Sequence, residues 1–308
     1  MFHALKKNNF FLLGKYNFIN ILFKIRKKHK INKNNFLFNR LLIFLIRSNH
    51  PKRWFLEYKN NDKINFNSLF FDKKNYKNLN IFIGDSHSEF HGRNFSKLDK
   101  NINLNLTYWM GPILLMDFLS SQKYCLQIIK FANLISKKIN YKKLNIVLCF
   151  GEIDVRCYFY EALEINKKFN NIEKLLCFIK IKLTKKINFL RKNINSKNYD
   201  IFFNDIQPVT NTKGYSPKTK KNLVLLKNII KFPVLGTILE RVHWRKKLSN
   251  YLFKNQKKIG LIFIKQINTV FASKNKAMNK KFSPDGIHIH DNKLLFDYQK
   301  KIIAYSNN

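Results

Sequence analysis

Two short segments at opposite ends of the chain carry the side-chain types of nucleophilic catalysis. The first reads Gly84-Asp85-Ser86-His87-Ser88, and the second reads Ser283-Pro284-Asp285-Gly286-Ile287-His288. A serine hydroxyl is a poor nucleophile near neutral pH and needs a base within hydrogen-bond reach. Histidine suits that role, and a carboxylate holds its ring in the correct tautomer. We therefore predict Ser86 as the nucleophile, His288 as its base and Asp285 as the carboxylate.

Each segment also has a simpler explanation. Asp85 or Ser86 could cap the helix that follows an apolar run, since both types are common helix caps. His288 could cap the last helix. The free N–H groups at a helix start, however, can also receive an oxyanion beside the serine. Because the two segments together supply a nucleophile, a base and a carboxylate, we favour the catalytic interpretation.

Acidic residues are scarce, with only 18 Asp and Glu in 308 residues, so their positions are informative. Several follow predicted strands, which is typical of a site and not of a solvated face. Arg156 lies among them, and it either serves as a donor or substrate clamp or pairs with a nearby acid to brace the loop. We expect substrate-binding or site-bracing roles for Asp85, His87, Glu152, Asp154 and Arg156.

The elements that must position these side chains form an alternating pattern. Short apolar runs predict five strands, at 80–84, 102–108, 145–150, 200–206 and 260–264. Helical stretches lie between and after them, at 114–138, 161–192, 238–257 and 292–304. Apolar strands separated by helices predict a parallel sheet covered on both faces, and ligands bind at the carboxyl ends of its strands. We expect this three-layer α/β domain to span residues 78–305.

The two catalytic segments resemble the first and last sequence blocks of the SGNH (GDSL-type) hydrolase superfamily. That resemblance implies a flavodoxin-like sheet, hydrolysis or transfer of acyl groups, and a triad of Ser86, Asp285 and His288. It also implies an oxyanion hole formed by the N–H groups of Ser86 and Gly111. The third block departs from the family, which has Gly-x-Asn-Asp where this chain has Gly151-Glu152-Ile153-Asp154. A missing oxyanion-hole donor costs about a hundred- to a thousandfold in rate.

The resemblance also suggests a substrate class. Gly-Asp-Ser-His, a Gly-Pro step and Gly-Glu-Ile-Asp-x-Arg are similar to an SGNH subgroup found in bacterial surface-polysaccharide contexts. That similarity implies an esterase or O-acyltransferase acting on an acyl ester, with acetyl expected, of a small molecule or a glycan. The proposed chemistry requires neither a metal nor an organic cofactor.

The N-terminal segment, residues 1–60, is a separate basic extension. Residues 1–56 hold 13 Lys and Arg and no acid, and the chain has a formal charge of +41. Clustered apolar residues there predict basic amphipathic helices. They either contact an anionic bilayer surface or pack on the main domain with a solvated basic face. With no secretory signal evident, we expect a cytoplasmic protein, peripheral to the inner face of the membrane if the extension binds there.

Two other classes of function are alternatives to a serine-dependent esterase or acyltransferase. Asp85-x-His87 and His288-x-His290 resemble the ends of dinuclear metal-dependent phosphoesterases, but the Gly-Asn-His segment of that class is absent. A basic, aromatic-rich protein could instead bind nucleic acid or an anionic polymer. Most Phe residues lie in apolar runs where burial explains them, so nucleic-acid binding is not favoured. The four cysteines form no C-x-x-C pair and are expected to be reduced, buried thiols.

Overall fold

The computed structural model describes residues 76–91, 103–137, 139–272, 275–283, 287–289 and 291–307. The chain divides into two compact units, Met1–Asn65 and Phe66–Asn308, and every described residue belongs to the second. The predicted basic extension at 1–60 lies outside the described residues, as do Asp285 and His290. The basic extension, the role of Asp285 and the alternative that involves His290 are therefore not tested by the structure.

The second unit contains a sheet of five parallel strands in the order β2-β1-β3-β4-β5. This is the strand order of flavodoxin-like folds. The prediction of a three-layer flavodoxin-like domain is therefore confirmed, and each predicted strand is present with its ends shifted by a few residues. The strands are β1 (Tyr76–Gly84), β2 (Asn103–Trp109), β3 (Tyr141–Cys149), β4 (Tyr199–Asn204) and β5 (Ile262–Ile264).

The central strands are apolar on both faces because helices cover both sides of the sheet. In β1, consecutive side chains that point to opposite faces are all fully buried, among them Ile81, Phe82 and Ile83. In β3 the side chains from Leu144 to Leu148 are also fully buried on both faces. All of them are apolar except Asn145. A run of this kind has no solvent side, which is why it indicated a central parallel strand.

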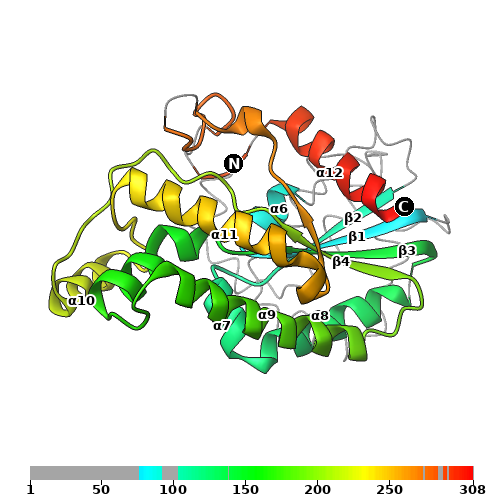
Figure 1. Ribbon diagram of the computed structural model, residues 1–308. Helices are drawn as coiled ribbons and strands as arrows, with labels where there is room; N and C mark the ends of the chain where they lie inside the picture. The colour runs from blue at the N-terminus through cyan, green and yellow to red at the C-terminus, as the bar shows by residue number, and fades with distance from the viewer. Residues whose placement is uncertain are drawn as a thin grey trace, which may run out of the picture. The chain divides into compact units, whose positions relative to one another are not determined.

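Two helical layers enclose the sheet (Figure 1). One layer contains α8 (Gln122–Ser136), α9 (Ile172–Asn193) and α11 (Ile238–Ile259), where α9 packs against both others. The opposite layer contains α6 (Ser86–His91) and α12 (Asn292–Asn307), which contact each other. Tyr298 and Ile302 of α12 pack on the sheet in a core cluster with Phe82, Val147, Cys149, Phe202 and Ile264.

Two of the predicted helices are interrupted. The expected helix at 114–138 consists of α7 (Leu115–Ser120) and α8, separated by Ser121 in an extended conformation with φ −115° and ψ 131°. The expected helix at 161–192 starts with a π-helical turn, Glu161–Ile165, and then breaks before α9. Asn171 caps α9 by accepting from the Lys174 N–H at 2.9 Å. Both breaks fall in short polar stretches, residues 120–123 and residues 166–171 with Phe169 as their one apolar member. Polar stretches of this length also occur on the exposed face of a continuous helix, so the breaks were not predicted.

Two further helical elements lie in the connections after β3 and after β4. The π-helical turn Asp154–Tyr158 follows β3, and α10 (Lys220–Ile229) lies in the long connection between β4 and α11. The connection packs back on the π-helical segment, since the Leu235 N–H donates to the Arg156 carbonyl at 2.8 Å. A short 3-10 turn, Asn268–Val270, follows β5.

The first three strands end level with one another. Gly84 is paired with Trp109 of β2 on one side and with Cys149 of β3 on the other. The Met110 N–H donates to the Gly84 carbonyl at 2.8 Å, and the Asp85 N–H points at the Cys149 carbonyl at 3.4 Å. The segments that follow these strands therefore emerge at one edge of the sheet, where the predicted site residues are found.

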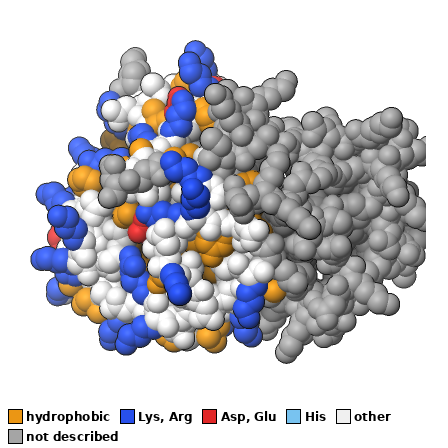
Figure 2. All heavy atoms as spheres, turned by 90° about the vertical axis from the view of Figure 1, so that its right-hand side faces the viewer, with side chains coloured by type: hydrophobic (Ala, Val, Ile, Leu, Met, Phe, Trp, Pro, Cys, Tyr) orange, Lys and Arg blue, Asp and Glu red, His pale blue; other side chains and the backbone are white. Residues whose placement is uncertain are grey.

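The surface of the described part of the chain is strongly basic. Lys and Arg side chains are spread over the face seen in Figure 2, with few Asp or Glu among them. No helix within the described ranges combines the length and apolar character needed to cross a bilayer. The four cysteines are free thiols, but Cys177 is exposed, so the expectation that all four are buried was wrong for this residue. Cys177 lies outside the buried face of α9, so its apolar neighbours in the sequence did not indicate burial.

Candidate active site

Ser86 is the first residue of α6, directly after the end of β1 and the bend at Asp85. Gly84 permits this sharp turn, because a Cβ at that position would lie 2.0 Å from the Cys149 carbonyl oxygen. The Asp85 side chain caps the turn by accepting from the His87 N–H at 2.9 Å. The helix-capping explanation therefore applies to Asp85, and it leaves the Ser86 hydroxyl available for other contacts.

The structure brings Ser86 and His288 together although 202 positions separate them in the sequence. Ser86 Oγ lies 2.7 Å from His288 Nε2, which is hydrogen-bonding distance. When the hydroxyl donates, Nε2 is the acceptor and the ring proton sits on Nδ1. That arrangement is the ground state expected for a serine that is activated by histidine.

Aromatic and apolar contacts fix the position of the His288 ring. Phe90, one turn further along α6, stacks on it with ring centroids 4.5 Å apart. The His87 ring lies on α6 as well, with its centroid 4.9 Å from that of His288. The next residue along the chain, Ile289, is buried in a small core cluster with Val270, Met278 and Leu295. The loop that carries His288 is thus anchored on one side by α6 and on the other by this cluster.

The third member of the predicted triad, Asp285, lies outside the described residues, so its place beside His288 stays a prediction. The same limit applies to the loop positions 284–286 around it. His290, which mattered for the phosphoesterase alternative, is not described either. Within the described ranges, no three His, Cys, Asp or Glu side chains form a group that could hold a metal ion.

Next to the Ser86–His288 pair lies a buried charged cluster of Asp85, His87, Glu152 and Arg156. His87 Nε2 is 3.5 Å from Glu152 Oε2, and Arg156 Nε is 3.3 Å from Glu152 Oε1. Three of the four side chains are almost fully buried, and that of Arg156 is 14% exposed. Glu152 and Arg156 therefore brace the turn after β3 and join it to α6, which is the structural role considered for Arg156.

The charges in this cluster shift one another's pKa values. Burial raises the pKa of Glu152, but the Arg156 guanidinium and His87 outweigh it and bring the value to about 2. Burial lowers the pKa of His87, while the Asp85 and Glu152 carboxylates raise it, and the net direction is upward. Burial raises the pKa of Asp85 to about 6 despite the opposing effect of His87. At neutral pH, Glu152 is therefore a carboxylate, paired with the Arg156 guanidinium and in contact with the His87 ring.

Asp154 serves the adjacent segment and not Ser86. Its two carboxyl oxygens accept from the backbone N–H groups of Leu115 at 2.5 Å and Met116 at 3.0 Å, at the start of α7. Burial raises the pKa of Asp154 to about 7, against the lowering effect of these two N–H groups. Asp154 thereby ties the π-helical turn after β3 to the segment that follows β2.

The two remaining oxyanion-hole positions differ from each other. Gly111 lies just after β2, with φ +91° and no atom within 4 Å of where a Cβ would be, so the space beside its backbone is open. Ile153 occupies the position where the family has asparagine, and its side chain is buried and apolar. No side-chain donor is thus available at position 153.

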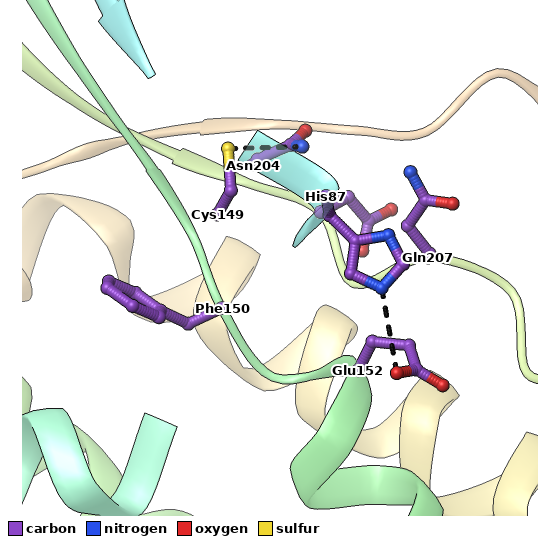
Figure 3. Close-up of a pocket in the computed structure, with 7 residues that line it drawn as sticks. His87, Cys149, Phe150, Glu152, Asn204 and Gln207 are labelled. Carbon is purple, nitrogen blue, oxygen red and sulfur yellow. Dashed lines mark hydrogen bonds and ion pairs between the residues drawn. The ribbon is translucent and has the colours of Figure 1, made fainter. Parts of the chain in front are cut away.

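A small cavity lies behind this cluster, bounded by His87, Cys149, Phe150, Glu152, Asn204, Asp205 and Gln207. Figure 3 shows the His87 ring between Glu152 and Gln207, with Cys149 and Asn204 in contact deeper in the fold. The cavity has room for roughly one water molecule and cannot hold an ester substrate. It therefore belongs to the support of the site and not to a substrate pocket.

Sequence reasoning missed three residues that contribute to this region: Phe90, Ile289 and Gln207. Phe90 could have been found, because it lies three residues after His87 and four after Ser86 on the same helix. Gln207 follows the carboxyl end of β4, which is also a position where site residues were expected. Ile289 carried no signal beyond being one apolar residue in a polar loop.

No protein-family model matches the chain, and a search of curated proteins finds no match. Several solved structures are similar to it, including two from Bacteroides. One is a GDSL-like lipase from Bacteroides thetaiotaomicron, 13% identical, covering 83% of this chain and 96% of its own, with a TM-score of 0.45. The other, from Bacteroides fragilis, is described as a "putative acylhydrolase" and is 13% identical, covering 76% of this chain and 87% of its own, with a TM-score of 0.41. With 13% identity and TM-scores below 0.5, neither match indicates which reaction this chain catalyses. The chemistry is therefore inferred from the geometry of Ser86 and His288.

Proposed function

We propose that this chain is a serine-dependent ester hydrolase or acyltransferase of the SGNH kind. The observation that carries the proposal is the 2.7 Å contact between Ser86 Oγ and His288 Nε2, formed at the carboxyl edge of a flavodoxin-like sheet. Both residues come from segments that resemble the family's first and last blocks. Ser86 is the nucleophile, His288 the general base, and Asp285 the carboxylate that orients the imidazole.

The reaction proceeds in two steps. His288 Nε2 takes the Ser86 hydroxyl proton as Oγ attacks the ester carbonyl, and the oxyanion is received by the backbone N–H groups of Ser86 and Gly111. The tetrahedral intermediate then expels the alcohol, which takes the proton from His288, and an acyl-serine remains. Water, or a sugar hydroxyl in a transferase, releases the acyl group by the same proton transfers in reverse order.

We further propose an O-acetyl group on a carbohydrate as the substrate. The support is the similarity of three short segments to an SGNH subgroup in polysaccharide contexts: Gly-Asp-Ser-His, the Gly-Pro step and Gly-Glu-Ile-Asp-x-Arg. A panel of acetylated sugars, compared with nitrophenyl esters of increasing chain length, tests this choice. Preference for acetyl over longer acyl chains, and for sugar over aryl leaving groups, is the expected result.

The catalytic assignment is tested with Ser86→Ala and His288→Ala. Each variant is expected to lose at least about a thousandfold in kcat/KM, because the serine and histidine act as one unit. A fluorophosphonate probe should label the wild-type protein and not Ser86→Ala. Ser121→Ala is the matched control, since that side chain makes no capping hydrogen bond and lies between α7 and α8. Labelling or turnover that survives in Ser86→Ala would contradict the proposal.

A further inference from the structure

The helix that begins with Ser86 is too short to hold its own position. Helix α6 has only six residues, Ser86 to His91, and helices of that length are not stable without tertiary contacts. Its N-terminal end is fixed by the turn at Gly84 and Asp85. Its last residue, His91, is hydrogen-bonded by two buried amide side chains, those of Gln299 and Gln207.

Three asparagines at matched positions begin this set of contacts. Asn145, Asn80 and Asn105 face one another across β3, β1 and β2. Asn145 Nδ2 donates to Asn80 Oδ1 at 2.7 Å, and Asn80 Nδ2 donates to Asn105 Oδ1 at 2.7 Å. All three side chains are at most 3% exposed. Buried amides in the middle of apolar strands are costly unless they are hydrogen-bonded, so the row must be paired across the sheet.

The row continues out of the sheet into the helices. Asn105 Nδ2 donates to Gln299 Oε1 at 2.8 Å, and Gln299 Nε2 donates to the His91 carbonyl at 2.6 Å. Asn80, Asn105 and Gln299 each accept through the side-chain oxygen and donate through the nitrogen. Asn145 begins the row as a donor only, so all hydrogen bonds in the row point the same way. The acceptor at the end is the backbone carbonyl of the last residue of α6.

The His91 side chain provides a second attachment for the same end of α6. Its Nε2 lies 2.6 Å from Gln207 Nε2, and because an amide nitrogen can only donate, His91 Nε2 is the acceptor. The His91 ring also contacts Tyr298, with centroids 4.9 Å apart. Tyr298 in turn donates to the Ile264 carbonyl of β5 at 2.8 Å. Neighbouring residues of α12 thus hold both the backbone and the ring of His91.

The contacts between α6 and α12 also affect the proposed catalytic pair. Helix α6 begins with Ser86, and α12 begins four residues after His288. We propose that Gln299 is a positioning residue for the Ser86–His288 pair. By joining the His91 carbonyl to the asparagine row, it fixes α6 against α12 and keeps the 2.7 Å contact between Oγ and Nε2. The inference rests on the proposed function, since it concerns how the same two side chains are held in register.

The test is Gln299→Met, which keeps the length of the side chain and removes the hydrogen bonds with Asn105 and with the His91 carbonyl. A shift of about 1 Å in reacting groups costs up to about a hundredfold in rate, so kcat should fall ten- to a hundredfold. KM should change little, because Gln299 is only 3% exposed and offers no surface to a substrate. The rate of labelling of Ser86 by a fluorophosphonate should fall in parallel with kcat.

A matched control separates positioning from a general loss of stability. Asn78 is 1% exposed, and its Nδ2 donates to Asn103 Oδ1 at 2.7 Å, so it forms the same kind of bond between β1 and β2 two residues earlier. Asn78→Leu should lower the free energy of unfolding to a similar extent and leave kcat within about twofold, since α6 and α12 keep their attachment. Gln299→Glu is the alternative if the methionine variant does not fold. It keeps the size of the side chain and the oxygen that accepts from Asn105, and it removes the N–H group that donates to the His91 carbonyl.

The outcomes are distinct. If the wild-type protein is active and Gln299→Met and Asn78→Leu lose kcat equally for equal loss of stability, Gln299 is only structural and the inference is wrong. An unchanged kcat in a folded Gln299 variant has the same meaning. If the wild-type protein neither turns over esters nor reacts with the probe, the proposed function itself fails, and the positioning role with it.

Discussion

Around Ser86, single residues have separate tasks that their neighbours define. Ser86 and His288 form a hydrogen-bonded pair, Phe90 and His87 contact the imidazole, and Glu152 pairs with His87 and Arg156. The Ile153 side chain offers no third donor to an oxyanion. In the proposed reaction the oxyanion is received by the backbone N–H groups of Ser86 and Gly111, and we expect a modest rate for simple esters because a third donor is missing at position 153.

The Glu152–Arg156 pair gives a pH-dependent prediction. Arg156→Met leaves a buried carboxylate with one fewer cationic partner, so about 3 kcal/mol of unfolding free energy should be lost near pH 7. The pKa of Glu152 is about 2 in the folded chain against an ordinary 4.5, so its ionised form stabilises the fold above pH 4.5 and loses this effect as the pH falls toward 2. Without Arg156 the pKa of Glu152 rises, so near pH 4 the buried carboxylate of the variant can be neutralised by a proton. The difference in unfolding free energy between the variant and the wild type should therefore be smaller near pH 4 than near pH 7.

Urea denaturation at the two pH values checks this prediction. The double variant Glu152→Gln/Arg156→Met is the control, because it removes the buried charge along with its partner. It should recover part of the stability lost at neutral pH. A loss that is the same near pH 4 and near pH 7 would show that Arg156 acts through packing and not through the Glu152 charge.

At the scale of elements, the turn from β1 into α6 depends on the close approach of β1 and β3. Gly84→Ala would place a methyl group 2.0 Å from the Cys149 carbonyl oxygen, at a φ of +155°. The backbone atoms cannot move aside without parting the two strands, so we expect a loss of about 3 kcal/mol or more, or failure to fold. Thermal and urea denaturation measure the loss.

Gly111→Ala is the comparison for that variant. Its φ of +91° is also unfavourable for alanine, but no atom lies within 4 Å of the added methyl group. The cost should therefore be only the backbone strain, about 1 kcal/mol. If both alanine variants lose the same stability, the contact between the two strands is not what requires glycine at position 84.

At the scale of the whole molecule, the basic N-terminal segment and the α/β unit can be tested apart. The contact pattern divides the chain between residues 65 and 66. We propose that residues 1–56, with 13 Lys and Arg and no acid, bind anionic bilayers. The full chain should bind vesicles that contain acidic phospholipid, and binding should weaken with added salt.

A fragment of residues 66–308 provides the comparison. It should keep the ester-hydrolysing activity and unfold cooperatively, while its affinity for acidic vesicles falls at least about tenfold, given roughly 1 kcal/mol for each basic residue near a charged membrane. Sedimentation with vesicles of neutral and acidic lipid measures both proteins. Equal affinity of the two would assign the binding to the basic surface of the α/β unit instead.

The sequence alone predicted the five strands, their parallel arrangement and the two segments that hold Ser86 and His288. These features are local, because an apolar run, a glycine at a strand end and a polar turn are visible within a few residues. The sequence also indicated that site residues would gather after strands, since parallel strands end at a common edge. The breaks at Ser121 and before Asn171 were not predicted, because a polar stretch of a few residues is equally compatible with the exposed face of a continuous helix.

Only the tertiary structure decided which side chains meet. The 2.7 Å contact between Ser86 and His288, the stacking of Phe90 and the buried row from Asn145 to Gln299 join segments that are distant in the sequence. Asn80, Asn105 and Asn145 stand within apolar strands, and only the strand register shows that they lie opposite one another. Register and packing depend on the whole sheet at once, so no single segment of the sequence contains that information.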